Sequence, residues 1–298
     1  MYPTHRTATY IPADRKEMDC PMARAPWLHE RKWSEIREYL NHDDVVLLPV
    51  GSTEQHGGAL PLMTDAAEAT AVAVGAGERC NVLVAPPLWY GWTPHHMGFP
   101  GTITLRPETL TAIVEDVCQS LFFHGFKRLL IINGHQVANL PPLEIAAVKV
   151  RNRTGGYVAI YDLGLSARVQ LRSIVSGEVG AVGHAGENES SQMLYSHPDL
   201  VDMNQARRNV VGSASEFFTG GFNTPDPMQD NINFAYAPPT VEEFTERASP
   251  YSGAMGDATK GSAATGRLIH EAEVTNICKL VELSRTHEVK LKQFSIPI

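Results

Sequence analysis

The stretch VVLLPVGSTEQHGGALPLMTD, which runs from Val45 to Asp65, begins apolar and then turns polar. Its first six residues, Val45 to Val50, predict a buried strand because they include β-branched side chains and stop at a glycine. In open α/β sheets, ligands gather just beyond the carboxyl ends of strands. The polar part of the stretch supplies three candidate metal ligands at such a place, Glu54, His56 and Asp65.

Two carboxylates and an imidazole suit zinc, manganese or iron better than calcium, which prefers oxygen ligands alone. The same residues also have an ordinary interpretation. Asp65 and Glu68 fit a helix N-cap with its capping-box partner, and Glu54 and His56 fit a solvated loop. A short motif of this kind is a hypothesis that only its structural context can confirm.

The composition is that of an ordinary globular protein. The chain has 298 residues, of which 43% are hydrophobic and 19% charged, and its formal net charge is −8. This negative charge argues against a general affinity for nucleic acid or for anionic membranes. No apolar stretch approaches the length of a membrane span.

The cysteines are few and scattered. Their spacing is neither that of a C-x-x-C metal or redox site nor that of a disulfide-rich secreted domain, and they occupy four distant positions, Cys20, Cys80, Cys118 and Cys278. We therefore expect reduced thiols in a cytoplasmic protein. The N-terminal residues lack the apolar core of a secretory signal.

Strands and helices alternate along the chain. Apolar runs that stop at turn residues predict further strands at 82–85, 128–133 and 157–161. Helical spacing predicts helices at 33–40, 66–76, 107–124, 141–152 and 259–283. This alternation implies an α/β fold with a parallel sheet covered on both faces. Right-handed crossovers then bring His135, which follows the strand at 128–133, to the edge that carries Glu54, His56 and Asp65.

Two further segments combine histidines with other polar or aromatic residues. The loop 88–102 contains His95 and His96 and three aromatics that could wall a pocket, although ordinary packing explains any one of them, Trp89, Tyr90 and Trp92. The segment 183–191 opens a predicted helix and holds His184, Glu187 and Glu189. Glu187 could simply stabilise the helix N-terminus, where a negative charge contributes ~0.3–1 kcal/mol.

Two other regions show little periodicity. Residues 1–30 predict an N-terminal arm that lies on the body or on a neighbouring subunit. Residues 209–250 predict a long structured loop over the site or at a subunit interface, because loops of that length are usually functional or disordered. No linker or internal repeat divides the chain, so residues 1–298 are expected to form one domain.

Four motifs in consistent order resemble the creatininase (creatinine amidohydrolase) family: GSTEQHG with a following Asp65, HHMGFPGT, NGH and HAGENESS. The segments 199–202 and 256–259 resemble later signatures of that family, and the match covers residues 45–283. The resemblance implies a three-layer α/β/α sandwich with a mostly parallel central sheet, and a site for two divalent metal ions, zinc, manganese or iron.

The resemblance also implies a ligand set. One ion would be held by three residues, Glu54, Asp65 and His135. The second would be held by His56, with Asp65 as the bridge. In creatininase itself the last ligand is a Glu two residues after the third-strand His, where this chain has Val137. A second branch of the family has a Glu in the His-Ala-Gly-Glu motif instead, and by resemblance to that branch the fifth ligand here is Glu187.

Two such ions would lower the pKa of a bridging water, and the hydroxide would attack an amide carbonyl. By the same resemblance His184 would shuttle the proton to the leaving nitrogen, and Glu189 would orient His184 or a ligand. The expected substrate contacts are Tyr90, Trp92, Thr93, His96 and Gln136. The aromatic members predict a small cyclic amide, such as a lactam. The segment 135–139, His-Gln-Val-Ala-Asn, is longer than the His-Gly-Gly-Asn of that branch, which predicts a reshaped pocket floor and argues against creatinine.

The resemblance implies a homohexamer that acts on a small-molecule amide. Three alternatives remain open: a hydrolase of linear formamides or N-acyl amines, a peptide-maturation protease, and a non-catalytic assembly protein. The presence of all five ligand-type residues argues against the last. A dinucleotide or nucleoside triphosphate enzyme would need a glycine-rich phosphate loop after a strand, and a serine hydrolase would need G-x-S-x-G; neither pattern is present.

Overall fold

The computed structural model describes residues 25–136, 138–166, 168–176, 181–209 and 238–296. Within these residues a parallel sheet has the strand order β2-β1-β3-β4. Its strands are β1 (Val45–Val50), β2 (Leu83–Val84), β3 (Arg128–Asn133) and β4 (Tyr157–Asp162). Val45 pairs with Arg128 and Val50 pairs with Asn133, so β1 and β3 start and end side by side.

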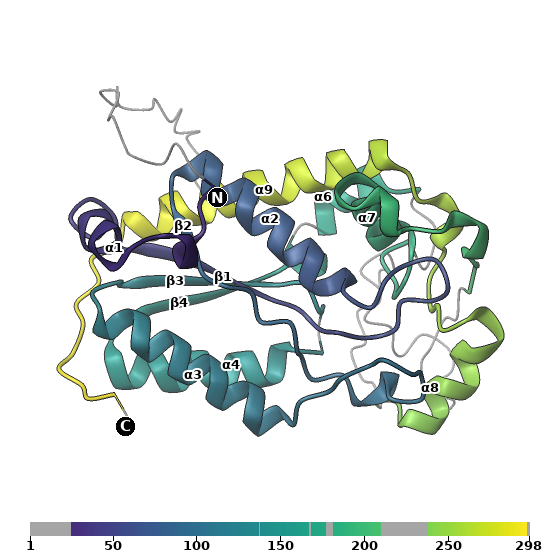
Figure 1. Ribbon diagram of the computed structural model, residues 1–298, viewed down its shortest axis with the longest axis horizontal. Helices are drawn as coiled ribbons and strands as arrows, with labels where there is room; N and C mark the ends of the chain where they lie inside the picture. The colour runs from purple at the N-terminus through teal and green to yellow at the C-terminus, as the bar shows by residue number, and fades with distance from the viewer. Residues whose placement is uncertain (1–24, 137, 167, 177–180, 210–237, 297–298) are drawn as a thin grey trace, which may run out of the picture.

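Helices cover both faces of this sheet (Figure 1). One face carries α2 (Thr64–Cys80) and α9 (Ala263–Arg285), and the other carries α3 (Pro107–Phe123) and α4 (Leu140–Thr154). The expected three-layer α/β/α architecture is thus confirmed. Burial on both faces explains why β1 and β3 are continuous apolar runs with no polar alternation.

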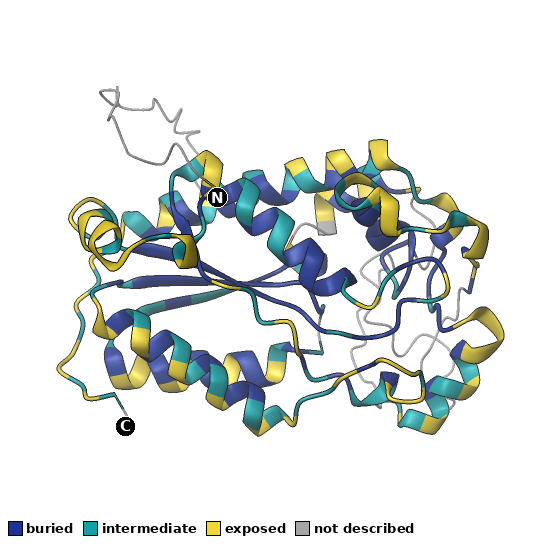
Figure 2. Cartoon of the chain, in the orientation of Figure 1, coloured by how far each residue is buried: buried dark blue, intermediate teal, exposed yellow. Residues whose placement is uncertain are grey.

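Two separate cores lie between the layers, because successive strand residues point to opposite faces. Leu47 packs with Val72 of α2 and Ile277 of α9, whereas its neighbour Leu48 lies in the core formed with α3 and α4. Complete burial of one such leucine side chain contributes about 1.5–3 kcal/mol. Figure 2 shows the result, with the sheet and the inward faces of the helices buried and the outer helix faces exposed.

The helix ends follow local sequence signals. Pro107 opens α3 at a position where its missing N–H costs nothing, and Gly155 closes α4 with φ +73°. Ser262 caps α9 by accepting a hydrogen bond from the Thr265 backbone N–H. The helices predicted at 33–40, 66–76, 107–124, 141–152 and 259–283 and the four predicted strands all occur, with ends that differ by a few residues.

Several shorter helices complete the described fold: α1 (Trp33–Tyr39), α5 (Leu163–Ser166), α6 (Arg168–Ile174), α7 (Glu187–Ser196) and α8 (Val241–Ala248). Of the predicted loop at 209–250, residues 210–237 lie outside the described part of the chain, as do residues 1–24 of the predicted arm. Helix α8 was not predicted. It begins in a capping box in which Thr240 and Glu243 bond each other's backbone N–H groups.

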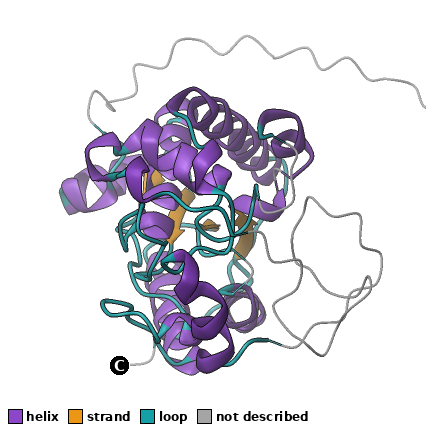
Figure 3. Cartoon of the chain, turned by 90° about the vertical axis from the view of Figure 1, so that its right-hand side faces the viewer, coloured by secondary structure: helices purple, strands orange, loops and turns teal. Residues whose placement is uncertain are grey.

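The strand order creates a switch point between β1 and β3. The chain leaves β1 into α2 on one face of the sheet, and it leaves β3 into α4 on the other face (Figure 1). A crevice opens outside the carboxyl ends of two such neighbouring strands. In the view of Figure 3, loops gather in front of the sheet at this end of the molecule.

The described residues bear on the predicted state of the cysteines and on the expected lack of a membrane span. The structure joins Cys80 of α2 to Cys278 of α9 as a disulfide, so the expectation of reduced thiols is wrong for this pair, while Cys118 is buried and free. Among the helices of the described residues, none is both long and apolar enough to cross a membrane.

Candidate metal centre

The site lies at the switch point, where two glycines let α2 approach the strand ends. A Cβ atom on Gly134 would lie 2.1 Å from the Asp65 carbonyl oxygen, and one on Gly51 would lie 2.4 Å from the Ala66 Cα. Any side chain at either position would push α2 away. The two glycines therefore bring Asp65, in the first turn of α2, to His135 just beyond β3.

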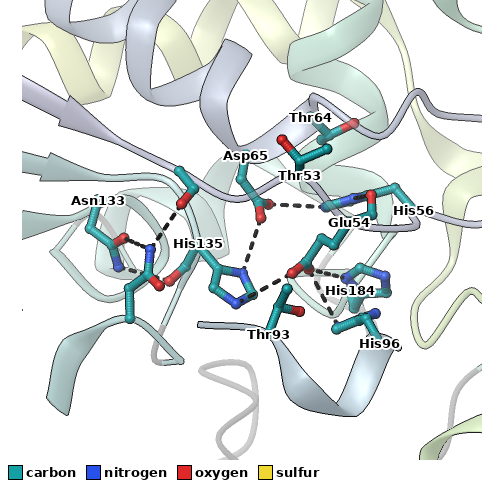
Figure 4. Close-up of polar contacts among 12 residues, drawn as sticks. Thr53, Glu54, His56, Thr64, Asp65, Thr93, His96, Asn133, His135 and His184 are labelled. Atoms are coloured by element: carbon teal, nitrogen blue, oxygen red, sulfur yellow. Dashed lines mark hydrogen bonds and ion pairs between the residues drawn. The ribbon is translucent and has the colours of Figure 1, made fainter. Parts of the chain in front are cut away.

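Glu54, Asp65 and His135 form the first group (Figure 4). His135 Nδ1 lies 3.0 Å from Asp65 Oδ2, and His135 Nε2 lies 3.3 Å from Glu54 Oε2. All three side chains are buried, with at most 6% exposed. Their ligand atoms are close enough together to bind one ion.

His56, His184 and Glu189 form a second group beside it. His56 Nε2 lies 3.0 Å from Asp65 Oδ1 and 3.7 Å from Glu189 Oε2. Each oxygen of Asp65 thus faces a different imidazole, His56 on one side and His135 on the other (Figure 4). This arrangement is what a carboxylate that bridges two ions would need.

Backbone carbonyls determine which nitrogen of His56 and of His135 carries hydrogen. His56 Nδ1 lies 3.1 Å from the Glu54 carbonyl oxygen, and His135 Nε2 lies 3.3 Å from the Trp92 carbonyl oxygen. A carbonyl only accepts, so both of these nitrogens donate. In the neutral rings, His56 Nε2 and His135 Nδ1 then direct lone pairs at the Asp65 carboxylate. Two acceptors in contact repel each other unless a cation or a proton lies between them.

In the first group, two buried carboxylate oxygens have no hydrogen-bond donor among the described residues, Glu54 Oε2 and Asp65 Oδ2. The 3.0 Å contact of Asp65 Oδ2 with His135 Nδ1 is not aligned as a hydrogen bond. An unsatisfied buried acceptor costs about 1–3 kcal/mol, and more when it is charged. Orphaned oxygens beside imidazole lone pairs fit a divalent transition metal, since these ligands suit zinc, manganese and iron.

The ionisable groups show the same need for a cation. Burial raises the pKa of Glu54 and of Glu189, each to about 7. Burial would lower the pKa of His135, but Glu54 and Asp65 outweigh it and raise the value to about 9. For Asp65, burial is outweighed by His56 and His135, which hold its pKa well below the usual range. Without an ion, protons hold the site together; a metal ion would displace them.

Two more histidines border Glu54 on its other oxygen. His96 Nε2 lies 3.4 Å from Glu54 Oε1, and His184 Nδ1 lies 3.7 Å from it. Burial lowers the pKa of both rings well below the ordinary value. The next largest lowering comes from His184 for the pKa of His96 and from His56 for the pKa of His184. These two histidines are therefore neutral.

Phe244 of α8 closes the site against these rings. Its ring centroid lies 4.4 Å from that of His96, 5.3 Å from that of His95 and 6.1 Å from that of His184. Burial, followed by the nearby His135, lowers the pKa of His95 to about 3. The described part of the region 209–250 therefore reaches the site, through a helix that the sequence did not reveal.

The structure brings seven of the expected site residues together: Glu54, His56, Asp65, His96, His135, His184 and Glu189. Thr93 is buried beside Glu54 (Figure 4). Glu187 lies apart from these groups, and both of its oxygens accept from the Ser176 backbone N–H at 3.0 Å. Glu189, and not Glu187, thus lies beside His56 and His184.

The other expected substrate contacts are less central. Trp92 packs partly against the core beside α3 and α4, and Tyr90 is 47% exposed. Gln136 lies against α5, where a Cβ on Gly164 would approach its Oε1 to 1.7 Å. Two residues that reach the histidines were not predicted, Gln55 and Phe244.

Comparisons with known proteins point to one family. A family model described as creatinine amidohydrolase matches residues 29–281. Creatinine amidohydrolase of Pseudomonas putida is 28% identical, over 87% of this chain and 97% of that protein. Mycofactocin precursor peptide peptidase of Mycobacterium ulcerans is 30% identical, over 86% of this chain and 91% of that protein.

The fold is similar to solved structures as well. A structure described as creatininase with Mn superposes with a TM-score of 0.68 at 27% identity, and the match covers 88% of this chain and 99% of that one. The similarity thus extends over nearly the whole of each protein. It includes the strand ends that carry the two groups of ligand-type side chains.

Proposed function

This chain belongs to the creatininase family, and from that premise we propose that it is a metal-dependent amidohydrolase that opens a small cyclic amide. One observation supports the proposal most strongly. His56 Nε2 and His135 Nδ1 face the two oxygens of Asp65, and backbone carbonyls accept from the opposite nitrogen of each ring, so each ring would direct a lone pair at Asp65 once its extra proton is lost. Such an arrangement needs a proton or a metal ion between each ring nitrogen and the carboxylate, and divalent ions would take the place of the protons.

We assign the ligands of two divalent ions. The first would be held by Glu54, Asp65 and His135. The second would be held by His56 and Glu189, with Asp65 as the bridge. Glu189 replaces Glu187 in this assignment because its oxygen lies 3.7 Å from His56, whereas Glu187 accepts hydrogen bonds elsewhere. Ions held in this way lower the pKa of a water molecule and polarise a substrate carbonyl.

Protein side chains would assist proton transfer and exclude water. Water gives its oxygen to the carbonyl carbon, and one of its protons goes to the leaving nitrogen as the C–N bond breaks. The groups near enough to assist are His184 and the carboxylates Glu54 and Glu189. Phe244, the half-buried ring of His95 and the buried ring of His96 restrict access to this point, which keeps bulk water away from the reacting groups.

The ring-lined boundary favours a compact substrate. The Pseudomonas putida relative is named for a small cyclic amide, which agrees with such a site. The Mycobacterium ulcerans relative is named a peptide peptidase, and its 30% identity over 86% of this chain makes peptide cleavage the second candidate. Linear formamides and N-acyl amines are a third group that the same ligands could hydrolyse.

Elemental analysis of the purified protein tests the metal assignment. We expect about two divalent ions per chain, with manganese, zinc and iron as the metals to measure. A protein that retains full amide hydrolysis after its metal content has fallen near zero would overturn the proposal. A screen of lactams, hydantoins, creatinine, linear formamides and short peptides would then choose among the substrate classes, and light scattering would test the proposed homohexamer.

A further inference from the structure

Gln55 lies between two proposed ligands in the sequence, but its side chain contacts the other two histidines. Its Nε2 lies 2.7 Å from His96 Nδ1 and 2.9 Å from His184 Nε2. The residue is only 5% exposed. One amide nitrogen therefore meets both rings that border Glu54 Oε1.

Backbone groups fix the orientation of this amide. The Gly57 backbone N–H donates to Gln55 Oε1 at 3.0 Å, and the Gly253 carbonyl accepts from Gln55 Nε2 at 3.0 Å. A flipped amide would place its nitrogen against an N–H group and its oxygen against a carbonyl. The nitrogen must therefore face the histidines, and it can only donate.

The tautomers of the two rings follow from this orientation. Gln55 Nε2 has two hydrogens for three acceptors, the Gly253 carbonyl and the two ring nitrogens, so these hydrogens are shared. An N–H on either ring nitrogen would point at the amide hydrogens, so neither His96 Nδ1 nor His184 Nε2 carries hydrogen. In a neutral ring the hydrogen then sits on the opposite nitrogen, which is Nε2 of His96 and Nδ1 of His184. These are the nitrogens that lie 3.4 and 3.7 Å from Glu54 Oε1.

The four histidines thus divide into two pairs. His56 and His135 are backed by carbonyl acceptors, so with a metal ion bound they would direct lone pairs into the site. His96 and His184 are backed by an amide donor and direct N–H groups into it. The atoms of Glu54, His96 and His184 are close enough to form a third metal group, but hydrogens occupy the positions that an ion would need.

We propose that Gln55 is a positioning residue that holds His96 and His184 as neutral hydrogen-bond donors, and so makes them neither metal ligands nor proton acceptors. The inference rests on the proposed function. The two N–H groups lie beside Glu54 Oε1, and our proposal places the substrate oxygen next to them, where a neutral N–H would stabilise the negative charge that develops on it. His184 then contributes a hydrogen bond, and the proton that water loses passes to a carboxylate before it reaches the leaving nitrogen.

Histidine ring ¹⁵N NMR of the metal-free protein tests the tautomers directly. We expect His96 to carry its hydrogen on Nε2 and His184 to carry it on Nδ1, with signals assigned by their loss in His96→Asn and His184→Asn. The inference is overturned if His184 carries hydrogen on Nε2 or is an imidazolium at neutral pH. This reading needs no bound ion, so it stands or falls separately from the elemental analysis.

Gln55→Glu tests the role in the metal-loaded enzyme. A carboxylate of the same shape cannot donate, so the ring hydrogens of His96 and His184 should move toward residue 55. We expect kcat to fall ~10²-fold or more, as when one donor to a developing oxyanion is removed, while KM and the binding of the two assigned ions stay near wild type. A third ion bound by the variant would support the reversal of the tautomers, since the Glu54, His96 and His184 group would then be free of ring hydrogens. Loss of the metal together with the activity would overturn the inference, since Gln55 would then be only structural.

Two further variants sharpen this test. Gly253 has φ +100°, and a Cβ there would lie 1.9 Å from Gln55 Oε1. Gly253→Ala should therefore displace the amide and reproduce the ring signals and the kcat loss of Gln55→Glu. The exposed Gln205 gives the control, because Gln205→Glu adds the same charge away from the site and should leave kcat unchanged. A Gly253→Ala protein with displaced Gln55 but wild-type kcat would contradict the proposal.

Discussion

Asp65 is the residue that both halves of the candidate metal centre share, because each of its oxygens faces a different imidazole. We expect Asp65→Ala to lose both ions and all amide hydrolysis while circular dichroism shows the fold retained. The fold should survive because both cores lie away from this side chain. A fully active Asp65→Ala enzyme would refute the bridging role.

The two glutamates of α7 provide a matched pair of variants. Glu189→Gln should weaken binding of one ion by more than the ~10–100-fold typical of losing a ligand's hydrogen-bond partner. Glu187→Gln should keep two ions, since its oxygens accept only from Ser176 in the described structure. Isothermal titration with Mn²⁺ or Zn²⁺ measures both. If Glu187→Gln lost an ion and Glu189→Gln kept both, Glu187 would be the ligand, as the family resemblance implies.

Some site residues could not be identified from the sequence. Glu187 and Glu189 stand two residues apart at the start of one helix, and only the helix rotation decides which carboxylate faces His56. Sequence alone does not fix that rotation. Gln55 was missed for a similar reason: its partners are 41 and 129 positions away, and no local pattern connects them.

At the scale of elements, the approach of α2 to the end of β3 depends on Gly134. We expect Gly134→Ala to destabilise the protein by about 1–3 kcal/mol, the usual cost of overpacking, and also to weaken metal binding because it separates Asp65 from His135. Thermal denaturation with and without metal measures both effects. Gly58→Ala is the control, since its Cβ would come no closer than 3.2 Å to Gln205 Cβ and 3.6 Å to the Gln205 carbonyl oxygen and Ser252 Cβ. Equal effects from the two variants would contradict this account.

A buried acid links β4 to α9. Tyr161 Oη donates to Glu273 Oε2 at 2.6 Å, and burial raises the pKa of Glu273 well above its ordinary value. The folded state thus holds a proton that the unfolded state releases near pH 4, so stability is full below that pH. It is lost as pH rises toward the folded pKa, at about 1.4 kcal/mol per pH unit.

Glu273→Gln cannot ionise, so we expect its stability advantage over wild type to grow between pH 5 and pH 8. Urea denaturation at several pH values measures the difference. Glu271→Gln on the same helix is the control: its side chain is exposed, and Arg79 lowers its pKa, so it should show no such gain. A constant difference across the pH range would rule out a buried, protonated Glu273.

The long elements were predictable because their signals are strong. Six apolar residues before a glycine defined β1, and regular apolar spacing after Pro107 defined α3. Helix α8 was not predicted, because the prolines around it resemble a loop. Its capping box at Thr240 and the spacing of Phe244 and Ala248 were the local signals available. The packing of Phe244 on the histidines could not be read from the sequence, since it is a tertiary contact.

At the scale of the whole molecule, the proposed ions would join segments that the chain connects only distantly. Glu54 and His56 follow β1, Asp65 opens α2, His135 follows β3, and Glu189 lies in α7. Without ions, this meeting point concentrates carboxylates that burial makes costly to ionise. The metal centre should therefore support the stability of the fold as well as the reaction.

Removal of metal by a chelator should then lower the melting temperature reversibly. Ions at 100 times their dissociation constant stabilise a folded protein by about 2.7 kcal/mol per site, and each kcal/mol shifts the melting temperature of a large domain by roughly 2–4 °C. We expect a loss of several degrees that Mn²⁺ or Zn²⁺ restores. Asp65→Ala should show no response to the chelator, because it has no ion to lose. If wild type and variant respond alike, the stabilising ion is bound elsewhere and the centre at the β1–β3 switch point is not the metal site.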